Sequence, residues 1–107
     1  MNSQPDFIAE LQYRTTEEGG RKTPVFTGYR PQVKFAFSEM QTSGIQTFID
    51  KETVYPGDKV IAEIIVLSTS FFEGSVEVGT SFEFREGSRV IGNGVIIEIR
   101  NPLLIKR

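Results

Sequence analysis

The side chains available for chemistry in this chain are carboxylates, hydroxyls, amides, lysines and arginines, because its 107 residues include no cysteine and no histidine. This removes thiolate nucleophiles, disulfides, and the commonest general base and metal ligand. The spacing of the carboxylates matches no recognised acid–base pair, and the candidates are Glu17, Glu18, Glu52, Glu83 and Glu86. We therefore expect a protein that is not an enzyme, with no metal site and no cofactor.

Two glycine patterns are similar to nucleotide-binding loops, but each lacks a required residue. Gly87 and Gly92 have the spacing of a phosphate-binding loop, yet Asn93 stands where that loop needs its lysine. The run Gly92-Asn93-Gly94 is not a dinucleotide fingerprint, since Ile97 occupies the place of the third glycine. We expect these glycines to permit a bulge or close packing in a strand, and we expect no nucleotide binding.

Basic residues are the remaining candidates for binding, and four of them lie in two polar turns. Arg21 and Lys22 follow a Gly-Gly pair, while Arg85 and Arg89 flank the turn centred on Gly87. Over the whole chain 12 basic residues stand against 14 acidic ones, which gives a net charge of −2. Any binding of nucleic acid must therefore come from a local basic patch.

Alternation of apolar and polar residues predicts the strands that position these turns. The six segments are 7–14, 33–38, 45–49, 59–67, 81–85 and 89–100. The pattern predicts Phe37 to face inward with Val33 and Phe35. It predicts a turn at 40–44, followed by a short strand whose alternating residues are Ile45, Thr47 and Ile49. Short strands without a helical period predict a single all-β domain, a small six-stranded antiparallel barrel with Greek-key-like connections.

Three motifs carry a resemblance to a known family. Residues 17–35 contain Gly-Gly-Arg-Lys-Thr-Pro and then Gly-Tyr-Arg-Pro-Gln, residues 85–89 read Arg-Glu-Gly-Ser-Arg before a Gly-x-Gly-Val run, and Pro-Gly-Asp occupies 56–58 between them. The chain closely resembles the C-terminal β-barrel, the third domain, of elongation factor Tu. The resemblance covers about residues 6–100 and implies that barrel as a stand-alone domain, with 1–5 frayed and 101–107 an extension. Tyr29 is expected to pack at a barrel corner.

The resemblance also implies an RNA-binding surface. In the family the two arginine loops meet and grip the T-stem backbone of aminoacyl-tRNA. The positions that match are Arg21, Gln32, Glu86 and Gly87, with Gln41 or Thr42 in place of a family threonine, and Lys22 and Arg89 add charge. Such groups reach phosphate and 2′-hydroxyl oxygens of an A-form helix without reading sequence. Ser88 replaces a family glycine and restricts the turn if its φ is positive.

Two alternatives remain open at this point. The arginines Arg21 and Arg89 can simply pair with Glu86 or Glu18 at the surface. The domain can also be a protein-interaction or homo-oligomerising module, which uses barrel faces that pack on other domains in the full-length factor. The candidates for such contacts are Phe71, Phe72, Val76, Val78, Leu103 and Leu104. We expect weak binding of tRNA or another structured RNA, or else a protein partner or homodimer.

The N-terminal residues and the apolar runs bear on where the protein acts. The start Met-Asn-Ser-Gln-Pro has no features of a leader, and no apolar run approaches the roughly 18 residues needed to cross a bilayer. We expect an independent cytoplasmic protein that does not bind membranes.

Overall fold

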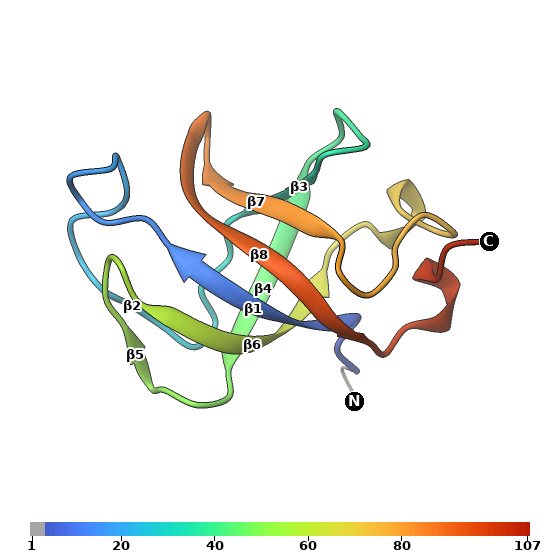
Figure 1. Cartoon of the computed structure of the whole chain (residues 1–107), viewed down its shortest axis with the longest axis horizontal. Coiled ribbons are helices and arrows are strands. Elements are labelled where there is room, and N and C mark those ends of the chain that lie inside the picture. The colour runs from blue at the N-terminus through green and yellow to red at the C-terminus, as the bar shows by residue number, and fades with distance from the viewer. Residues whose placement is uncertain (1–3) are drawn as a thin grey trace.

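The computed structural model describes residues 4–107 and folds them into a closed antiparallel barrel (Figure 1). Its strands are β1 (Phe7–Tyr13), β3 (Gln32–Phe35), β4 (Thr42–Phe48), β6 (Lys59–Val66), β7 (Ser81–Glu86) and β8 (Arg89–Ile99). They follow one another around the barrel in the order β1-β6-β4-β3-β7-β8, and β8 closes on β1. The barrel strands β3, β4 and β6 follow one another in the chain and pair side by side. Strand β1, which precedes them, lies next to β6 rather than next to β3, and this arrangement is a Greek key. The predicted fold class is confirmed.

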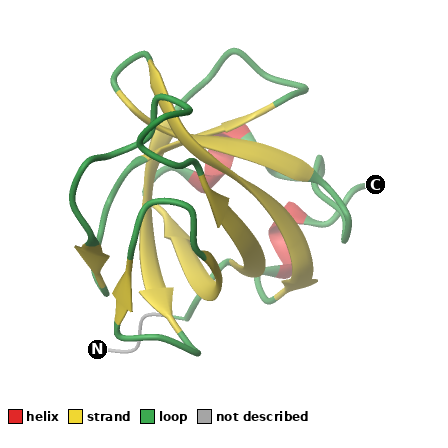
Figure 2. Ribbon diagram, turned by 60° about the vertical axis from the view of Figure 1, so that its left-hand side comes forward, coloured by secondary structure: helices red, strands yellow, loops and turns green. Residues whose placement is uncertain are grey.

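Four short elements complete the chain. The strands β2 (Val25–Phe26) and β5 (Thr53–Val54) form a two-stranded ribbon outside the barrel. The two 3-10 turns are η1 (Thr69–Phe71) and η2 (Pro102–Leu104). Figure 2 shows the strands wrapped around a common interior with loops at both ends.

Aromatic and aliphatic side chains of alternate strand residues fill the barrel. On β1 the predicted inward residues Phe7, Ala9, Leu11 and Tyr13 are all buried. Phe7 packs against Phe82 of β7 with ring centroids 5.5 Å apart. The predicted alternation past β3 was wrong at Phe37. The strand ends at Phe35, so Phe37 is 49% exposed and stacks on the Phe35 ring.

In strand β4 the face that carries Ile45 and Thr47, which the alternation predicted to be one face of the strand, points outward, and the other face points into the barrel. Its inward residues are Thr42, Gly44, Gln46 and Phe48, whereas Ile49 lies beyond the strand and is exposed. The strand also begins at Thr42, inside the segment predicted to be a turn. Gly44 is needed because a Cβ there would lie 2.4 Å from Cγ2 of Val33. Three of the four inward residues are a threonine, a glycine and a glutamine, so the apolar residues of this segment did not identify its buried face.

Two glycines of β8 let aromatic rings pack across that strand, as predicted. A Cβ at Gly92 would lie 2.3 Å from Cζ of Phe84, and a Cβ at Gly94 would lie 2.3 Å from Cζ of Phe82. The β7–β8 register shifts between Phe84 and Arg85, next to the turn at Gly87. Such a bulge changes the direction of the side chains that follow it, here at the rim of the barrel.

The C-terminal segment beyond β8 is part of the fold. Val76 forms a parallel bridge with Ile105, and its backbone N–H donates to the oxygen of Leu104 at 2.9 Å. Leu104 is buried in the core cluster. The carboxylate of Asp6 accepts from the Val66 backbone N–H at 2.8 Å, and from the Asn101 side chain at 2.9 Å. The segment 101–107 therefore packs on the barrel.

The N-terminal residues expected to be frayed lie partly outside the described residues. That holds for residues 1–3. Of the other two, Gln4 is exposed and Pro5 is buried.

Candidate nucleic-acid interface

The loop between β1 and β2 is held by its own hydrogen bonds and presents Arg21. The Thr15 backbone N–H donates to Oε1 of Glu18 at 2.8 Å, and the Glu18 N–H donates to Oγ1 of Thr15 at 3.1 Å. The pKa of Glu18 is lowered by hydrogen bonds from Thr15 to its carboxylate, first from the backbone N–H and then from the side chain. Gly19 has a φ of 98°, and a Cβ at Gly20 would lie 2.5 Å from a backbone oxygen, so both turn positions require glycine.

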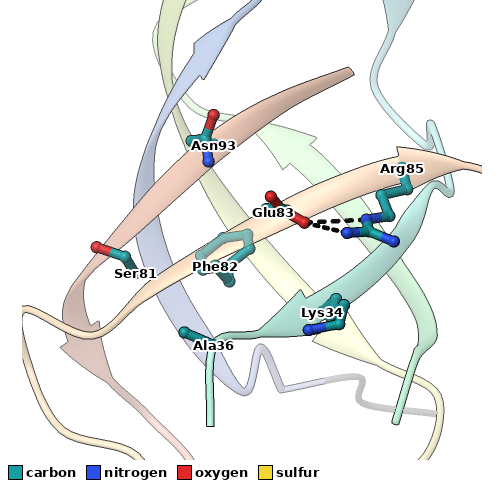
Figure 3. Close-up of a pocket in the computed structure, with 7 residues that line it drawn as sticks. All are labelled: Lys34, Ala36, Ser81, Phe82, Glu83, Arg85 and Asn93. Carbon is teal, nitrogen blue, oxygen red and sulfur yellow. Dashed lines mark hydrogen bonds and ion pairs between the residues drawn. The ribbon is translucent and has the colours of Figure 1, made fainter. Parts of the chain in front are cut away.

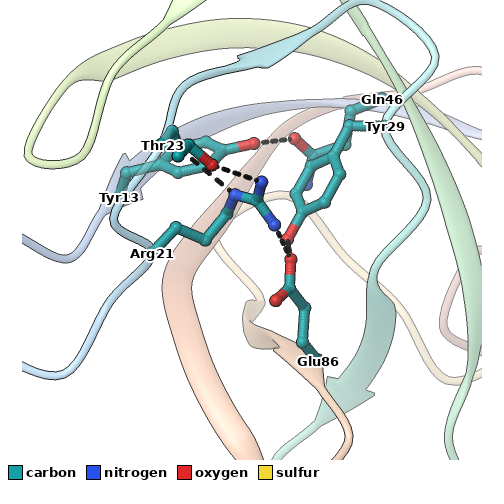
Figure 4. Close-up of polar contacts among 6 residues, drawn as sticks. All are labelled: Tyr13, Arg21, Thr23, Tyr29, Gln46 and Glu86. Carbon is teal, nitrogen blue, oxygen red and sulfur yellow. Dashed lines mark hydrogen bonds and ion pairs between the residues drawn. The ribbon is translucent and has the colours of Figure 1, made fainter. Parts of the chain in front are cut away.

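Arg21 lies at the centre of a polar cluster that joins this loop to the β7–β8 turn (Figure 4). Its Nη1 donates to Oε2 of Glu86 in an ion pair. Its Nε and Nη2 donate to the backbone and hydroxyl oxygens of Thr23, at 3.3 and 3.0 Å. The guanidinium carbon lies 5.3 Å from the centroid of the Tyr29 ring, within the range of a cation–π contact.

These contacts fix the guanidinium without using all of it. A guanidinium carries five N–H donors, and the bonds to Glu86 and Thr23 use three of them. The side chain of Arg21 is 25% exposed. Two of its N–H groups therefore donate no hydrogen bond to another side chain or backbone oxygen of residues 4–107.

Glu86 and Tyr29 form the acidic side of the cluster. The Tyr29 hydroxyl donates to the same Glu86 oxygen, Oε2, that accepts from Arg21. Burial opposes ionisation of the Glu86 carboxyl, but the hydrogen bonds from Tyr29 and Arg21 outweigh it, so the pKa of Glu86 is lowered. Burial raises the pKa of Tyr29, which keeps the phenol protonated as a donor. The cluster is a fixed hydrogen-bonded unit near neutral pH.

A second polar contact lies beneath this cluster. The buried hydroxyl of Tyr13 donates to Oε1 of Gln46 at 2.5 Å, and burial raises the pKa of Tyr13. The Gln46 Nε2 is the one buried side-chain nitrogen or oxygen without a hydrogen-bond partner in residues 4–107. The Tyr13 ring also packs against Tyr29, with the two ring centroids 6.3 Å apart.

The structure brings most of the predicted RNA-binding residues to one rim of the barrel. Arg21 contacts Glu86, and Lys22 follows in the same loop. Gly87 lies in the β7–β8 turn, and Arg89 is the first residue of β8. Gln32 pairs across β3 and β7 with Arg85, the residue that precedes Glu86. We call the surface made by Arg21, Lys22, Gln32, Glu86, Gly87 and Arg89 the rim surface.

Thr42 does not belong to this surface, which corrects the expectation for that residue. It faces inward on β4 with 6% of its surface exposed, and its hydroxyl oxygen accepts from the Ser68 backbone N–H at 3.1 Å. The alternative position, Gln41, is exposed. Thr42 therefore has a structural role in this conformation.

Arg21 and Arg89, for which surface ion pairs were an alternative to RNA binding, differ in their contacts. Arg21 pairs with Glu86, whereas Arg89 is exposed and has no ion-pair partner among residues 4–107. Glu18 bonds within its own loop. The turn itself is unstrained at Ser88, because only glycines have positive φ in the described chain and Gly87 takes that role with a φ of 63°.

Half of the residues predicted for protein contacts are buried, so those predictions were wrong as surface sites. Phe72 and Val76 are fully buried, and Leu104 is 1% exposed. The reason is that the segment before β7 folds back on the C-terminal segment through the Val76–Ile105 bridge. The residues that remain exposed are Phe71, Val78 and Leu103.

The barrel surface has one shallow hollow on its outer wall, and a second lies beside the β2–β5 ribbon. One, of about 410 Å³, lies over β3, β7 and β8, and the other, of about 520 Å³, is lined by residues 26–27 and 48–52. Within residues 4–107 no group of three or more side chains is placed to hold a metal ion. No helix in this part of the chain is long and apolar enough to span a membrane.

These features define a class: a small closed Greek-key barrel in which two loops, joined by an ion pair, carry cations at one rim. Comparison with protein-family models matches residues 1–100 to the elongation factor Tu C-terminal domain. The chain belongs to this family of translation-factor domains. In elongation factor Tu, a GTPase, this domain is not the catalytic one. Residues 101–107 lie beyond the match.

Proposed function

We propose that this domain is a non-catalytic, cytoplasmic binding module that contacts the backbone of structured RNA, of the aminoacyl-tRNA T-stem kind, through the rim surface. The observation that carries the proposal is the Arg21–Glu86 ion pair. It holds the first loop and the β7–β8 turn together, so residues 65 positions apart in the chain lie on one surface.

The groups at the rim suit an RNA backbone. Lys22 and Arg89 are exposed cations that can face phosphates, and Arg21 retains two N–H donors beside them. Gln32 donates to Oγ of Ser43 at 3.2 Å, which leaves its side-chain oxygen to accept from a 2′-hydroxyl. Phosphate and 2′-hydroxyl contacts position a protein on A-form RNA without specifying a sequence.

The size of these contacts predicts weak binding. Three charge-assisted hydrogen bonds of about 1.5–3 kcal/mol each total about 5–9 kcal/mol, while micromolar affinity needs about 8.2 kcal/mol after association costs. Neutralising about three phosphates gives a salt slope near −2.7, so the affinity falls on the order of 40-fold between about 50 and 200 mM salt.

The test is a titration of labelled aminoacyl-tRNA with this protein at these two salt concentrations, for wild type, Lys22→Glu and Lys106→Glu. Lys22 is the better target than Arg21, because it is exposed and its replacement leaves the Arg21–Glu86 pair intact. Lys106 lies in the C-terminal segment, at the opposite end of the long axis from the first loop (Figure 1). Its variant makes the same change in net charge.

We expect saturable binding that weakens with salt. Lys22→Glu should reduce the affinity about tenfold or more, because one contact contributes about 1.5 kcal/mol. Lys106→Glu should change the affinity little. Equal weakening by both variants would show that only net charge matters. Absence of binding at low salt and high protein concentration would end the proposal.

A second candidate function is docking of a protein partner or a second copy of the chain. The observation that favours it is that two exposed aromatic residues, Phe37 and Phe71, both pack against buried Phe72, with ring centroids 6.3 and 6.1 Å from that of Phe72. Sedimentation equilibrium of wild type and Phe71→Ser measures this. A dimer that the substitution dissociates would support docking, and a monomer at all concentrations would exclude self-association.

A further inference from the structure

One hollow lies on the outer wall of the barrel, over strands β3, β7 and β8 (Figure 3). It has a volume of about 410 Å³, and its polar lining comes from three adjacent strands: Lys34 on β3, Glu83 and Arg85 on β7, and Asn93 on β8. Lys34 pairs with Glu83 across β3 and β7, and Glu83 pairs with Asn93 across β7 and β8. Because neighbouring strands lie about 4.8 Å apart, these three residues form a row about 10 Å long.

We call this hollow the wall pocket. Strand pairing places some of its residues next to residues of the rim surface. Gln32 of the rim surface pairs with Arg85 of the wall pocket, and Glu86 directly follows Arg85. Lys34 lies two residues beyond Gln32, a distance of about 7 Å along the strand. A backbone that runs over the rim at Arg21 and Gln32 therefore meets Lys34 and Arg85 next.

The charges in the wall pocket are arranged for both a phosphate and a hydroxyl. Nε and Nη2 of Arg85 donate to Oε1 of Glu83 at 3.0 and 2.5 Å. This leaves three of the five N–H groups of Arg85, both of those on Nη1 among them, without an acceptor among residues 4–107. Lys34 has no ion-pair partner in that range, so two cations face the hollow beside a single carboxylate.

The carboxylate decides which anionic ligand fits. A site for phosphate alone gains nothing from Glu83, since a second negative charge repels the ligand. Oε2 of Glu83 accepts no hydrogen bond from the described residues, and Asn93 adds an amide that both donates and accepts. A 2′-hydroxyl, which is both donor and acceptor, matches these two groups and distinguishes RNA from DNA.

We propose that the wall pocket binds a ribose-phosphate unit of the same RNA helix that lies on the rim surface. Lys34 and Arg85 contact the phosphate, and Glu83 and Asn93 contact the 2′-hydroxyl. This inference rests on the proposed function, because it extends the same RNA contact from the rim to the wall.

The experiment compares binding of a short mixed-sequence RNA duplex and of the DNA duplex of the same sequence, at several salt concentrations. The variants are Lys34→Gln for the phosphate contact, Asn93→Ala for the hydroxyl contact, Lys22→Gln for the rim surface, and Lys106→Gln as a distant control. The side chain of Lys34 makes no hydrogen bond or ion pair with the described residues, so we expect its replacement to preserve the fold, which thermal unfolding checks.

We expect Lys34→Gln to weaken RNA binding about tenfold, and its salt slope to fall by about 0.9, with Lys106→Gln unchanged. Asn93→Ala is expected to reduce the preference for RNA over DNA at least threefold. If Lys22→Gln weakens binding while Lys34→Gln and Asn93→Ala leave affinity, salt slope and preference unchanged, the wall pocket is not an RNA site and the proposed function stands. If the wild-type chain binds neither duplex, both proposals fail.

Discussion

Replacement of Glu86 by glutamine removes the charge that joins the two loops and keeps an acceptor oxygen in its place. The carboxylate accepts from Arg21 and from Tyr29. A hydrogen bond to a charged group contributes about 1.5–3 kcal/mol, and a neutral one about 1 kcal/mol. The Glu86 side chain is 37% exposed, so solvent screening reduces the difference. We expect Glu86→Gln to lower the free energy of unfolding by about 1 kcal/mol at pH 7.

The sign of the pH dependence follows from the pKa of Glu86. It is lower in the folded protein than the ordinary value of 4.5, because the bonds from Tyr29 and Arg21 outweigh the effect of burial. The carboxylate therefore contributes stability above about pH 4.5, and this contribution is lost as the pH falls through the lowered folded value. The difference between wild type and Glu86→Gln should be full at pH 7 and shrink below pH 4.5.

Urea unfolding at a series of pH values from 7 to 3 measures both effects. Glu83→Gln is the matched control, since it removes a carboxylate that pairs with Arg85 on the outer wall. We expect it to cost less than Glu86→Gln, because Arg85 lies on the same strand and the pair joins no loops. A Glu86→Gln difference that is absent at pH 7, or that grows as the pH falls, would refute the reasoning.

Three further substitutions test the packing. Gly94→Ala places a Cβ 2.3 Å from the Phe82 ring, so we expect a loss of about 1–3 kcal/mol in thermal unfolding, and a loss below 0.5 kcal/mol would contradict the close contact. Leu104→Ala should cost about 2–5 kcal/mol if the C-terminal segment is part of the core, whereas a neutral result would make the segment dispensable. Tyr13→Phe should cost about 1–3 kcal/mol, because Oε1 of buried Gln46 then loses its donor, and adding Gln46→Met should recover most of that loss. Failure of the second change to recover stability would show that Tyr13 acts through packing.

The sequence predicted the fold where hydrophobic alternation and burial agree. The inward residues of β1 illustrate this, since Phe7, Ala9 and Leu11 are both apolar and buried. In β4 they disagree, because the inward residues include Gly44 and Gln46, which serve the close approach of Val33 and a polar contact with Tyr13. Apolar periodicity carries no signal for either requirement.

The rim surface was predictable as a set of residues but not as a bonded cluster. The resemblance placed Arg21 and Glu86 near each other, and the ion pair agrees with that placement. Nothing in the sequence indicated that Thr23 accepts from Arg21 or that Tyr29 donates to Glu86, because those contacts depend on loop geometry. The burial of Thr42 was likewise missed, since it follows from the register of β4 with its neighbours.

The burial of Val76 and Leu104 depends on a contact between segments far apart in the chain. Short apolar stretches beside polar ones predict either a docking surface or a packed segment, and local sequence does not distinguish these. The bridge between Val76 and Ile105 shows that the two segments pack against each other.

The most direct test of the RNA-binding surface is a titration of the ¹⁵N-labelled protein with aminoacyl-tRNA, followed by the backbone amide signals. We expect the signals of Arg21, Lys22 and Gly87 to shift or broaden saturably, while those of Val76 and Leu104 at the other end stay unchanged. Changes confined to the Val76–Leu104 end, or no change at low salt, would contradict the assignment of RNA binding to the rim surface.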